Sequence, residues 1–245
     1  MFSFFKKKEP EKLFYSTDMH CHIVPGIDDG APTPQAGADL VEAQQRWGIR
    51  RIIATPHVTA DTFENTPETI APALAVLKEE LSARGIDMPI IHSAEYRIDD
   101  YTMDEFNRGV VMPMPDDYLL VENPFIQEPV NLDRTIFDLK VKGHNLVLAH
   151  PERYCYYHLN LPRYSQLRNA GLKFQVNLLS LAGHYGKEQK RVAEWMIENK
   201  MVDFLGSDLH RPQHVVAIDR YLQSRDYKRH RAALESRLLN DRLDF

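Results

Sequence analysis

The chain has 245 residues, of which 43% are hydrophobic and 27% are charged, and its formal net charge is −5. This composition is typical of a soluble globular protein with one large domain or two small ones, and without a basic surplus no nucleic-acid partner is expected. No apolar run approaches the roughly 18 residues of a transmembrane segment, and two cysteines outside any CxxC pair suit a reducing cytoplasm.

The chain begins with MFSFFKKKEPEKLF, in which a short apolar part precedes the charges, whereas a signal peptide has the reverse order. We therefore predict a flexible N-terminal tail over residues 1–14 and a single domain over residues 15–245, located in the cytoplasm. In an alternative interpretation the phenylalanines of the tail meet lipid and Lys6–Lys8 meet anionic headgroups, which places the chain at the inner face of the membrane. Three aromatic side chains give only marginal membrane affinity, so we favour the first interpretation.

Seven short apolar runs follow along the chain, and each ends in a polar residue that can bind a metal. In chain order the runs are LFYSTDMHCH, RRIIATPH, MPIIHSAE, DYLLVEN, HNLVLAH, LKFQVN and VDFLGSDLH. Helix-like stretches lie between them over residues 34–48, 66–85, 128–143 and 187–200, and the second has Thr66 as its N-cap and Pro67 at its first position. Strand runs that alternate with helices indicate parallel βαβ units.

Seven such units predict an α/β fold in the form of a distorted (β/α)7 TIM-like barrel. The chemistry of a β/α barrel is located at the carboxyl ends of its strands, which is where the polar residues fall. An open doubly wound sheet is the competing fold. It is disfavoured because no glycine-rich phosphate loop follows the first run, and because polar ends on all seven strands converge only if the sheet closes.

The polar ends form a set of candidate metal ligands. Residues i and i+2 of a strand point to the same face, so the two imidazoles of His20-Cys21-His22 can share one ion, and Asp208 and His210 repeat this geometry. A single histidine at a strand end is more often a satisfied core residue, and Asp29 taken alone is an ordinary turn residue. The complete set is His20, His22, Asp29, His57, Glu95, Glu122, His150, Asp208 and His210.

Nine ligands are too many for one ion and suit two or three divalent ions. Nitrogen and oxygen donors without a thiolate favour manganese, with iron or zinc as alternatives. Four carboxylates and three such ions leave a net charge of about +2, which suits a phosphate monoester dianion and a metal-activated water. Arg153 and Arg211 each follow a candidate ligand and are candidate phosphate contacts; the alternatives are a salt bridge to a neighbouring loop for Arg153 and a solvated helix start for Arg211.

The motifs DMHCH, DDG, TPH, SAE, VEN, AHPERY and SDLH, in this order and spacing, resemble the PHP (polymerase and histidinol phosphatase) superfamily. Within it they are most similar to the bacterial manganese-dependent protein-tyrosine phosphatases of capsule and exopolysaccharide loci. The resemblance covers roughly residues 16 to 240. It implies the PHP fold, a trinuclear metal centre, and hydrolysis of phosphotyrosine on a protein, with a membrane-associated tyrosine kinase as the implied partner.

The resemblance also implies a role for each ligand. The implied sets are His20, His22, Glu95 and Asp208 for one ion, Glu95, Glu122 and His150 for a second, and Asp29, His57 and His210 for a third. Arg153 matches the phosphate-side arginine of the family. The family often has a longer polar loop with a second arginine after the final D-x-H, whereas SDLHRPQH is short, so Arg211 matches this role less closely.

Four other functions are alternatives to phosphotyrosine hydrolysis. A phosphatase for histidinol phosphate or another small phosphomonoester would use the same ligands, so the sequence leaves it open. An amidohydrolase would need a carboxylated lysine at a strand end, and none is present; a non-catalytic metal-dependent regulator would be expected to have lost ligands. A cysteine-based phosphatase is excluded, because neither Cys21 nor Cys155 is followed, after five residues, by the arginine that such an enzyme requires.

Overall fold

A computed structural model describes residues 11–245, and its strands pair in parallel throughout. One sheet has the strand order β1 (Thr17–Asp18), β2 (Arg51–Ala54) and β4 (Ile90–His92). The other has the order β3 (His57–Val58), β5 (Glu95–Arg97), β6 (Tyr118–Glu122), β7 (Asn145–Ala149), β8 (Lys173–Asn177) and β9 (Phe204–Gly206). The α/β fold predicted from the alternation of runs and helices is confirmed, with the parallel sheet curled into a half-barrel.

Each of the seven apolar runs contains a strand, and the second and third runs are each divided between the two sheets. The second run divides at Pro56, which has no N–H to donate to a ladder and separates β2 from β3. Between the segments that follow β1 and β9, the pairing is an isolated parallel bridge from Cys21 to Leu209.

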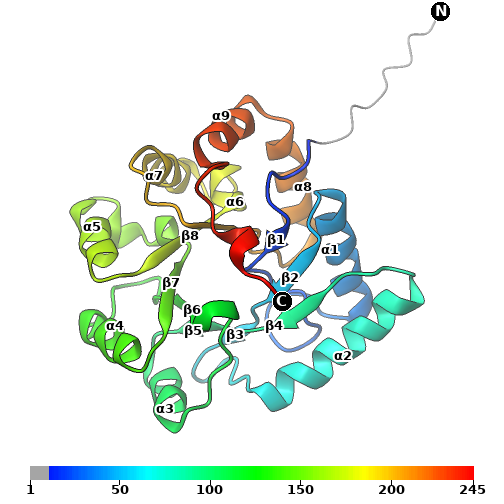
Figure 1. Ribbon diagram of the computed structural model, residues 1–245, viewed down its shortest axis with the longest axis horizontal. Helices are drawn as coiled ribbons and strands as arrows, with labels where there is room; N and C mark the ends of the chain where they lie inside the picture. Colours follow the sequence, from blue (N-terminus) through cyan, green and yellow to red (C-terminus); the bar gives the residue numbers. More distant parts are fainter. Residues whose placement is uncertain (1–10) are drawn as a thin grey trace, which may run out of the picture.

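Helices surround the strands on the outside (Figure 1). Four of them were predicted: α1 (Pro34–Arg46), α2 (Pro67–Ala83), α4 (Leu132–Val141) and α7 (Lys187–Glu198). Thr66 is the N-cap of α2, with Pro67 in its first turn, as expected. The helices not predicted are α3 (Asp100–Arg108), α5 (Pro162–Asn169), α6 (Leu178–Leu181), α8 (Pro212–Leu222) and α9 (Arg225–Leu234). Among the described residues, no helix combines the length and the apolar character needed to span a membrane.

Two hydrophobic layers hold the strands and helices together. Strands that are covered on both faces carry apolar side chains on both faces, which gives one layer on each side. The larger layer lies between strands and helices and contains Trp47, Phe174 and Leu205. The smaller one, here called the inner cluster, is made up of Met19, Ile53, Met114, Leu120, Val147, Ala149, Phe204 and Leu243. Leu243 belongs to the C-terminal segment, which in Figure 1 crosses in front of the strands.

The C-terminal segment is fixed at the amino ends of the strands by Asn240, in the short helix η4 (Asn240–Arg242). The side chain of Asn240 is fully buried; its Nδ2 donates to Thr17 O (3.0 Å) and Leu205 O (2.7 Å), and its Oδ1 accepts from Leu205 N (3.0 Å). One amide group therefore joins β1, β9 and the C-terminus. The opposite ends of the strands are left free for other side chains.

The predicted domain boundary at residue 15 is too late. Leu13 is buried and its N–H donates to Trp47 O (2.8 Å), while Phe14 packs edge-on against Tyr15 and tilts over Tyr227. Apolar side chains at these positions are part of the packed structure, which corrects the last part of the predicted tail. Residues 1–10 of that tail, including the segment considered for membrane contact, lie outside the described residues.

We expect Asn240→Ala to lower the free energy of unfolding by about 3 kcal/mol, because it leaves three buried backbone groups without partners. Urea unfolding monitored by circular dichroism measures this change. Asn160→Ala, at an exposed loop position, is the matched control and should leave the midpoint unchanged. Equal stability of the two variants would show that the C-terminal segment is not fixed in this way.

Candidate metal centre

The nine predicted ligands come together at the ends of the apolar runs. His20 and His22 follow β1, His57 begins β3, and Glu95 begins β5. The others are Glu122 at the end of β6, His150 after β7, Asp208 and His210 after β9, and Asp29 in the loop before α1. Their side chains are buried, except that His57 is 14% exposed and Asp29 is 51% exposed.

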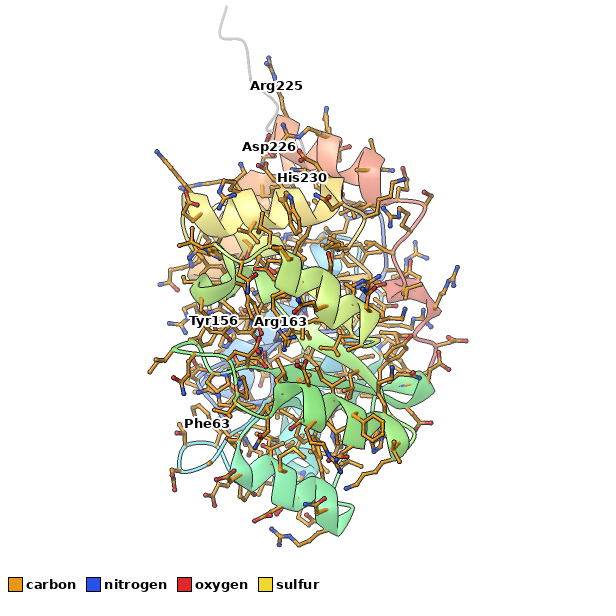
Figure 2. The ribbon with its side chains drawn as sticks, turned by 90° about the vertical axis from the view of Figure 1, so that its left-hand side faces the viewer. Phe63, Tyr156, Arg163, Arg225, Asp226 and His230 are labelled. Carbon is orange, nitrogen blue, oxygen red and sulfur yellow. The ribbon has the colours of Figure 1, made fainter. Side chains whose placement is uncertain are left out.

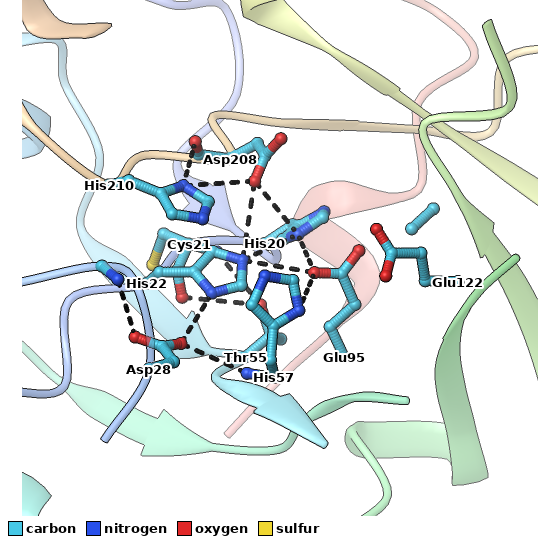
Figure 3. Close-up of polar contacts among 12 residues, drawn as sticks. His20, Cys21, His22, Asp28, Thr55, His57, Glu95, Glu122, Asp208 and His210 are labelled. Atoms are coloured by element: carbon cyan, nitrogen blue, oxygen red, sulfur yellow. Dashed lines mark hydrogen bonds and ion pairs between the residues drawn. The ribbon is translucent and has the colours of Figure 1, made fainter. Parts of the chain in front are cut away.

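Glu95 lies at the centre of this cluster (Figure 3). Its Oε2 is 3.2 Å from His20 Nε2, 3.3 Å from His22 Nε2 and 3.2 Å from His57 Nδ1. Its Oε1 is 2.8 Å from His150 Nε2. Although Glu95 Oε2 is buried, it has no hydrogen-bond partner among the described residues. A buried carboxylate oxygen that faces three imidazole nitrogens without a hydrogen bond has the surroundings of a metal ligand.

The two aspartates complete the cluster on either side of the imidazoles. Asp208 Oδ1 is 3.5 Å from the Nε2 atoms of both His20 and His22. Asp29 Oδ1 lies 3.3 Å from His210 Nε2 and 3.5 Å from His57 Nε2. His20 Nε2 and His22 Nε2 therefore each lie within 3.5 Å of both Glu95 and Asp208.

Among the described residues, three groups have donor atoms close enough together to hold an ion. They are His22, Asp29, His57 and His210; His20, His22 and Asp208; and His20, Glu95 and His150. Glu122 is outside these groups. Its Oε2 accepts from Nε (3.2 Å) and Nη2 (2.9 Å) of Arg97, while its Oε1 is 3.6 Å from His150 Nε2.

The carboxylates and imidazoles of the cluster shift one another's pKa values. Although burial on its own lowers it, the pKa of His20 is raised to about 10 by the carboxylates of Glu95 and Asp208. Burial likewise raises the pKa of Glu95, but the neighbouring imidazoles hold it well below its ordinary value. The negative potential that retains a proton on an imidazole also attracts a divalent cation, which displaces that proton when it binds. The donor set therefore fits nitrogen- and oxygen-bound divalent metal ions.

Two polar residues, neither of them a predicted ligand, orient the candidate ligands. His22 Nδ1 lies 2.8 Å from Asp28 Oδ2, which also accepts from His57 N (3.2 Å). His20 Nδ1 lies 2.8 Å from Gln175 Oε1. With its Nδ1–H donated in this way, each imidazole presents Nε2 to the centre, the arrangement seen around metal-bound histidines. Asp28, the first residue of the DDG motif, therefore supports two of the candidate ligands.

Two glycines permit this close packing. A Cβ at Gly30 would lie 2.2 Å from His22 O, and one at Gly206 would lie 2.7 Å from His20 Cβ. Any larger residue would push these ligands aside. The glycine of the DDG motif is therefore explained by the approach of its loop to His22.

Two of the ligands have strained backbones. His150 has a φ of 31° and Asp208 has a φ of 49°, both in the left-handed region that residues other than glycine rarely adopt. Each such residue costs about 1–3 kcal/mol and persists only where surrounding contacts hold it, a situation concentrated at functional sites.

Asp208 is held from behind by three donors to its Oδ2. They are Asn177 Nδ2 (2.6 Å), Arg153 Nη1 (3.0 Å) and the hydroxyl of Tyr185 (3.2 Å). This leaves Oδ1 of Asp208 directed at the histidines. The same contact fixes Arg153, whose guanidinium also lies between two rings, 4.2 Å from the centroid of Tyr185 and 4.7 Å from that of Phe125.

A cavity of about 420 Å³ opens over the cluster. Arg153 and Arg211, both predicted from the sequence, line it, and so does Arg97, which was not predicted. Arg211 is half-exposed, occupies the N-cap position of α8 and lies 3.9 Å from Asp29 Oδ2, so both interpretations given for it fit its position. His184 and His214, which end no apolar run and were not predicted, also line the cavity.

Cys21 has no access to this cavity. Its side chain is fully buried in the larger hydrophobic layer, with Sγ 3.9 Å from Ile53 O. Burial raises the pKa of its thiol well above the ordinary value. A neutral, enclosed thiol is not a nucleophile.

Comparison with known proteins connects the chain to phosphatases. The family model of capsular polysaccharide synthesis, CpsB/CapC, matches residues 16–223. The tyrosine-protein phosphatase YwqE of Bacillus subtilis is 32% identical over 194 residues, which cover 79% of this chain and 76% of that protein. A putative tyrosine-protein phosphatase, CapC of Staphylococcus aureus, is 26% identical over 228 residues, which cover 92% and 89%.

Solved structures agree with this result. One from work on YwqE of Bacillus subtilis and CpsB of Streptococcus pneumoniae, described as unique metal-dependent tyrosine phosphatases, matches with a TM-score of 0.78 and 29% identity, covering 94% of this chain and 95% of that one. The lactonase Lmo2620 of Listeria monocytogenes matches with a TM-score of 0.52 at 12% identity and shares the fold alone.

We expect Asp28→Ala to weaken the binding of manganese about 10- to 100-fold, because His22 and the backbone of His57 lose their shared acceptor. Isothermal titration of the chelator-stripped protein with manganese measures the dissociation constant. Asp39→Ala, at an exposed position of α1, is the control. An unchanged constant in Asp28→Ala would mean that Asp28 does not support the ligands.

Proposed function

This chain belongs to the capsular polysaccharide synthesis family CpsB/CapC, and on this premise we propose that it hydrolyses phosphotyrosine on protein substrates with divalent metal ions. The observation that carries the proposal is the buried Oε2 of Glu95, which faces three imidazole nitrogens and has no hydrogen-bond partner among the described residues. Tyrosine-protein phosphatases among its relatives, described as metal-dependent in the case of YwqE and CpsB, support the same activity.

We assign the three groups of donors defined above to two or three ions, with Glu122 joining His150. The nitrogen and oxygen donors favour manganese, with iron or zinc as alternatives. Such ions, when bound, neutralise phosphoryl charge and acidify a water molecule that serves as the nucleophile. We further propose that the two sheets together form the seven-stranded, distorted barrel of the PHP fold, which is the arrangement that brings all run ends to one opening.

The residues of the chain itself bind and orient the phosphoryl group. Arg153 lines the cavity and is pinned by Asp208 and two aromatic rings, so its planar guanidinium is held in place before the substrate arrives. A preorganised guanidinium can bind two phosphoryl oxygens at once. We assign Arg211 a supporting contact at the rim, where its exposure leaves it free to move toward an anion.

We also propose that the substrate protein is a membrane-associated bacterial tyrosine kinase, which this chain meets at the cytoplasmic side of the membrane. The support for this step is the involvement of the family in capsular polysaccharide synthesis. A small phosphomonoester such as histidinol phosphate is the alternative substrate, and a non-catalytic metal-dependent regulator is a further alternative.

Removal of metal tests the activity directly. We expect chelator-treated protein to lose turnover of a phosphotyrosine peptide and to regain it with manganese, because the buried carboxylates need a cation to complete the site. Phosphate release is measured with phosphotyrosine peptide, phosphoserine peptide and histidinol phosphate in parallel, each with manganese, iron or zinc. Turnover that survives chelation contradicts metal dependence, and cleavage of histidinol phosphate alone contradicts the protein-phosphatase assignment.

Cys21→Ser should retain most of the activity, whereas His20→Ala should lose it by about 100-fold or more, since only the histidine faces the centre. The kcat for phosphotyrosine peptide and the metal content of each variant are measured together. Loss of activity in Cys21→Ser with normal metal content would overturn the metal mechanism in favour of a thiol.

A further inference from the structure

The cavity over the cluster contains an aromatic feature that binding of a phosphoryl group does not use. Its lining is otherwise mainly charged or polar, yet Phe63 and Phe125 are part of it. Neither ring can bind an anion or a metal. An apolar wall in a charged cleft suits the part of a substrate that carries no charge.

Phe63 is held rigidly on one side of the opening. It follows β3 in a tight turn, in which Thr59 N donates to Phe63 O (2.9 Å) and Phe63 N donates to Thr59 O (3.1 Å). Its ring is nearly parallel to that of His57, with centroids 5.8 Å apart and an angle of 14°. Phe63 and Tyr156 mark the same edge of the molecule in Figure 2, opposite the C-terminal segment.

Phe125 stands over a different ligand. Its ring lies 5.7 Å from that of His150 at an angle of 16°, and the guanidinium of Arg153 lies over it at 4.7 Å. These contacts engage the faces of the ring, while 37% of the residue remains exposed. The edge of the Phe125 ring is therefore available for contact with a molecule bound in the cavity.

The two rings flank the centre because of the histidines they cover. His57 approaches Glu95 at Oε2 and His150 approaches it at Oε1, so Phe63 and Phe125 stand on different sides of that carboxylate. A phosphoryl group bound over Glu95 would project its ester oxygen into the cavity between them. A phenyl ring on that oxygen can contact both, by stacking or edge-to-face, whereas the short alkyl group of a phosphoserine offers no such ring.

Resting on the proposed function, we propose that Phe63 and Phe125 form an aromatic slot that recognises the phenyl ring of the substrate and makes this cleft selective for aryl phosphates over alkyl phosphates. Phe63 acts on the ring alone. Phe125 contacts the ring and also positions Arg153, so its removal affects the binding of the phosphoryl group as well.

The test separates ring recognition from phosphate binding. For Phe63→Leu we expect the KM for phenyl phosphate to rise roughly 3- to 10-fold, the range that an aromatic pair contributes, with kcat changed less than KM. The inhibition constant of inorganic phosphate, which has no ring, and the kcat/KM for glycerol 2-phosphate should stay unchanged. Phe63→Tyr should restore the KM. In Phe125→Leu, both the KM for phenyl phosphate and the inhibition constant of phosphate should rise.

Metal content and thermal midpoint are measured for every variant, and Phe137→Leu, at an exposed position of α4 outside the cavity, is the control. Equal changes for phenyl phosphate and inorganic phosphate in Phe63→Leu would overturn the slot, and so would no change in either. If the wild-type protein hydrolyses no phosphotyrosine peptide, the proposed function fails. If the wild-type protein hydrolyses the peptide but substitution of Phe63 leaves the kinetics unchanged, only the slot is overturned.

Discussion

The buried charge of Glu95 is the constraint on which the rest of the structure depends. A carboxylate removed from water costs several kcal/mol unless opposite charge or hydrogen bonds compensate it. Four imidazoles from three segments of the chain approach it, yet its Oε2 has no hydrogen-bond partner among the described residues. Side chains alone therefore leave this oxygen unsatisfied, and divalent cations complete the balance. The same requirement explains the buried aspartate and the raised pKa of His20.

Buried charge and strained backbone make such a site destabilising, and the fold places other residues in charge of stability elsewhere in the domain. Left-handed backbones at His150 and Asp208 and close approaches at Gly30 and Gly206 occur at or beside the candidate ligands. The inner cluster along the strands and the buried amide of Asn240 at their amino ends hold the sheets and the C-terminus together. This division is that of β/α barrels in general, in which chemistry occupies one face and stability the other.

The cavity combines two kinds of recognition, and Arg153 takes part in both. Its guanidinium donates to the candidate metal ligand Asp208, and it also lies over the rings of Phe125 and Tyr185. Under the proposals made above, charge attracts the phosphoryl group and the aromatic surface contacts the group attached to it. The relatives named as tyrosine-protein phosphatases support the proposed slot, since a phosphotyrosine is an aryl phosphate.

The sequence by itself determined the strands and the identity of the nine candidate ligands. Apolar runs of strand length ending in His, Asp or Glu are local features, and parallel strands carry their carboxyl ends to the same side whatever their register. The short, strongly polar α9 was missed, because its helix depends on packing against α7 and α8 more than on its own apolar pattern. Only the tertiary structure decided that Arg97 holds Glu122, since this pair arises from the register of β5 against β6. The same holds for the supports Asp28 and Gln175 and for the position of Phe63 in the cavity wall. These contacts depend on which segments of the chain meet, and local sequence does not encode the distances between those segments.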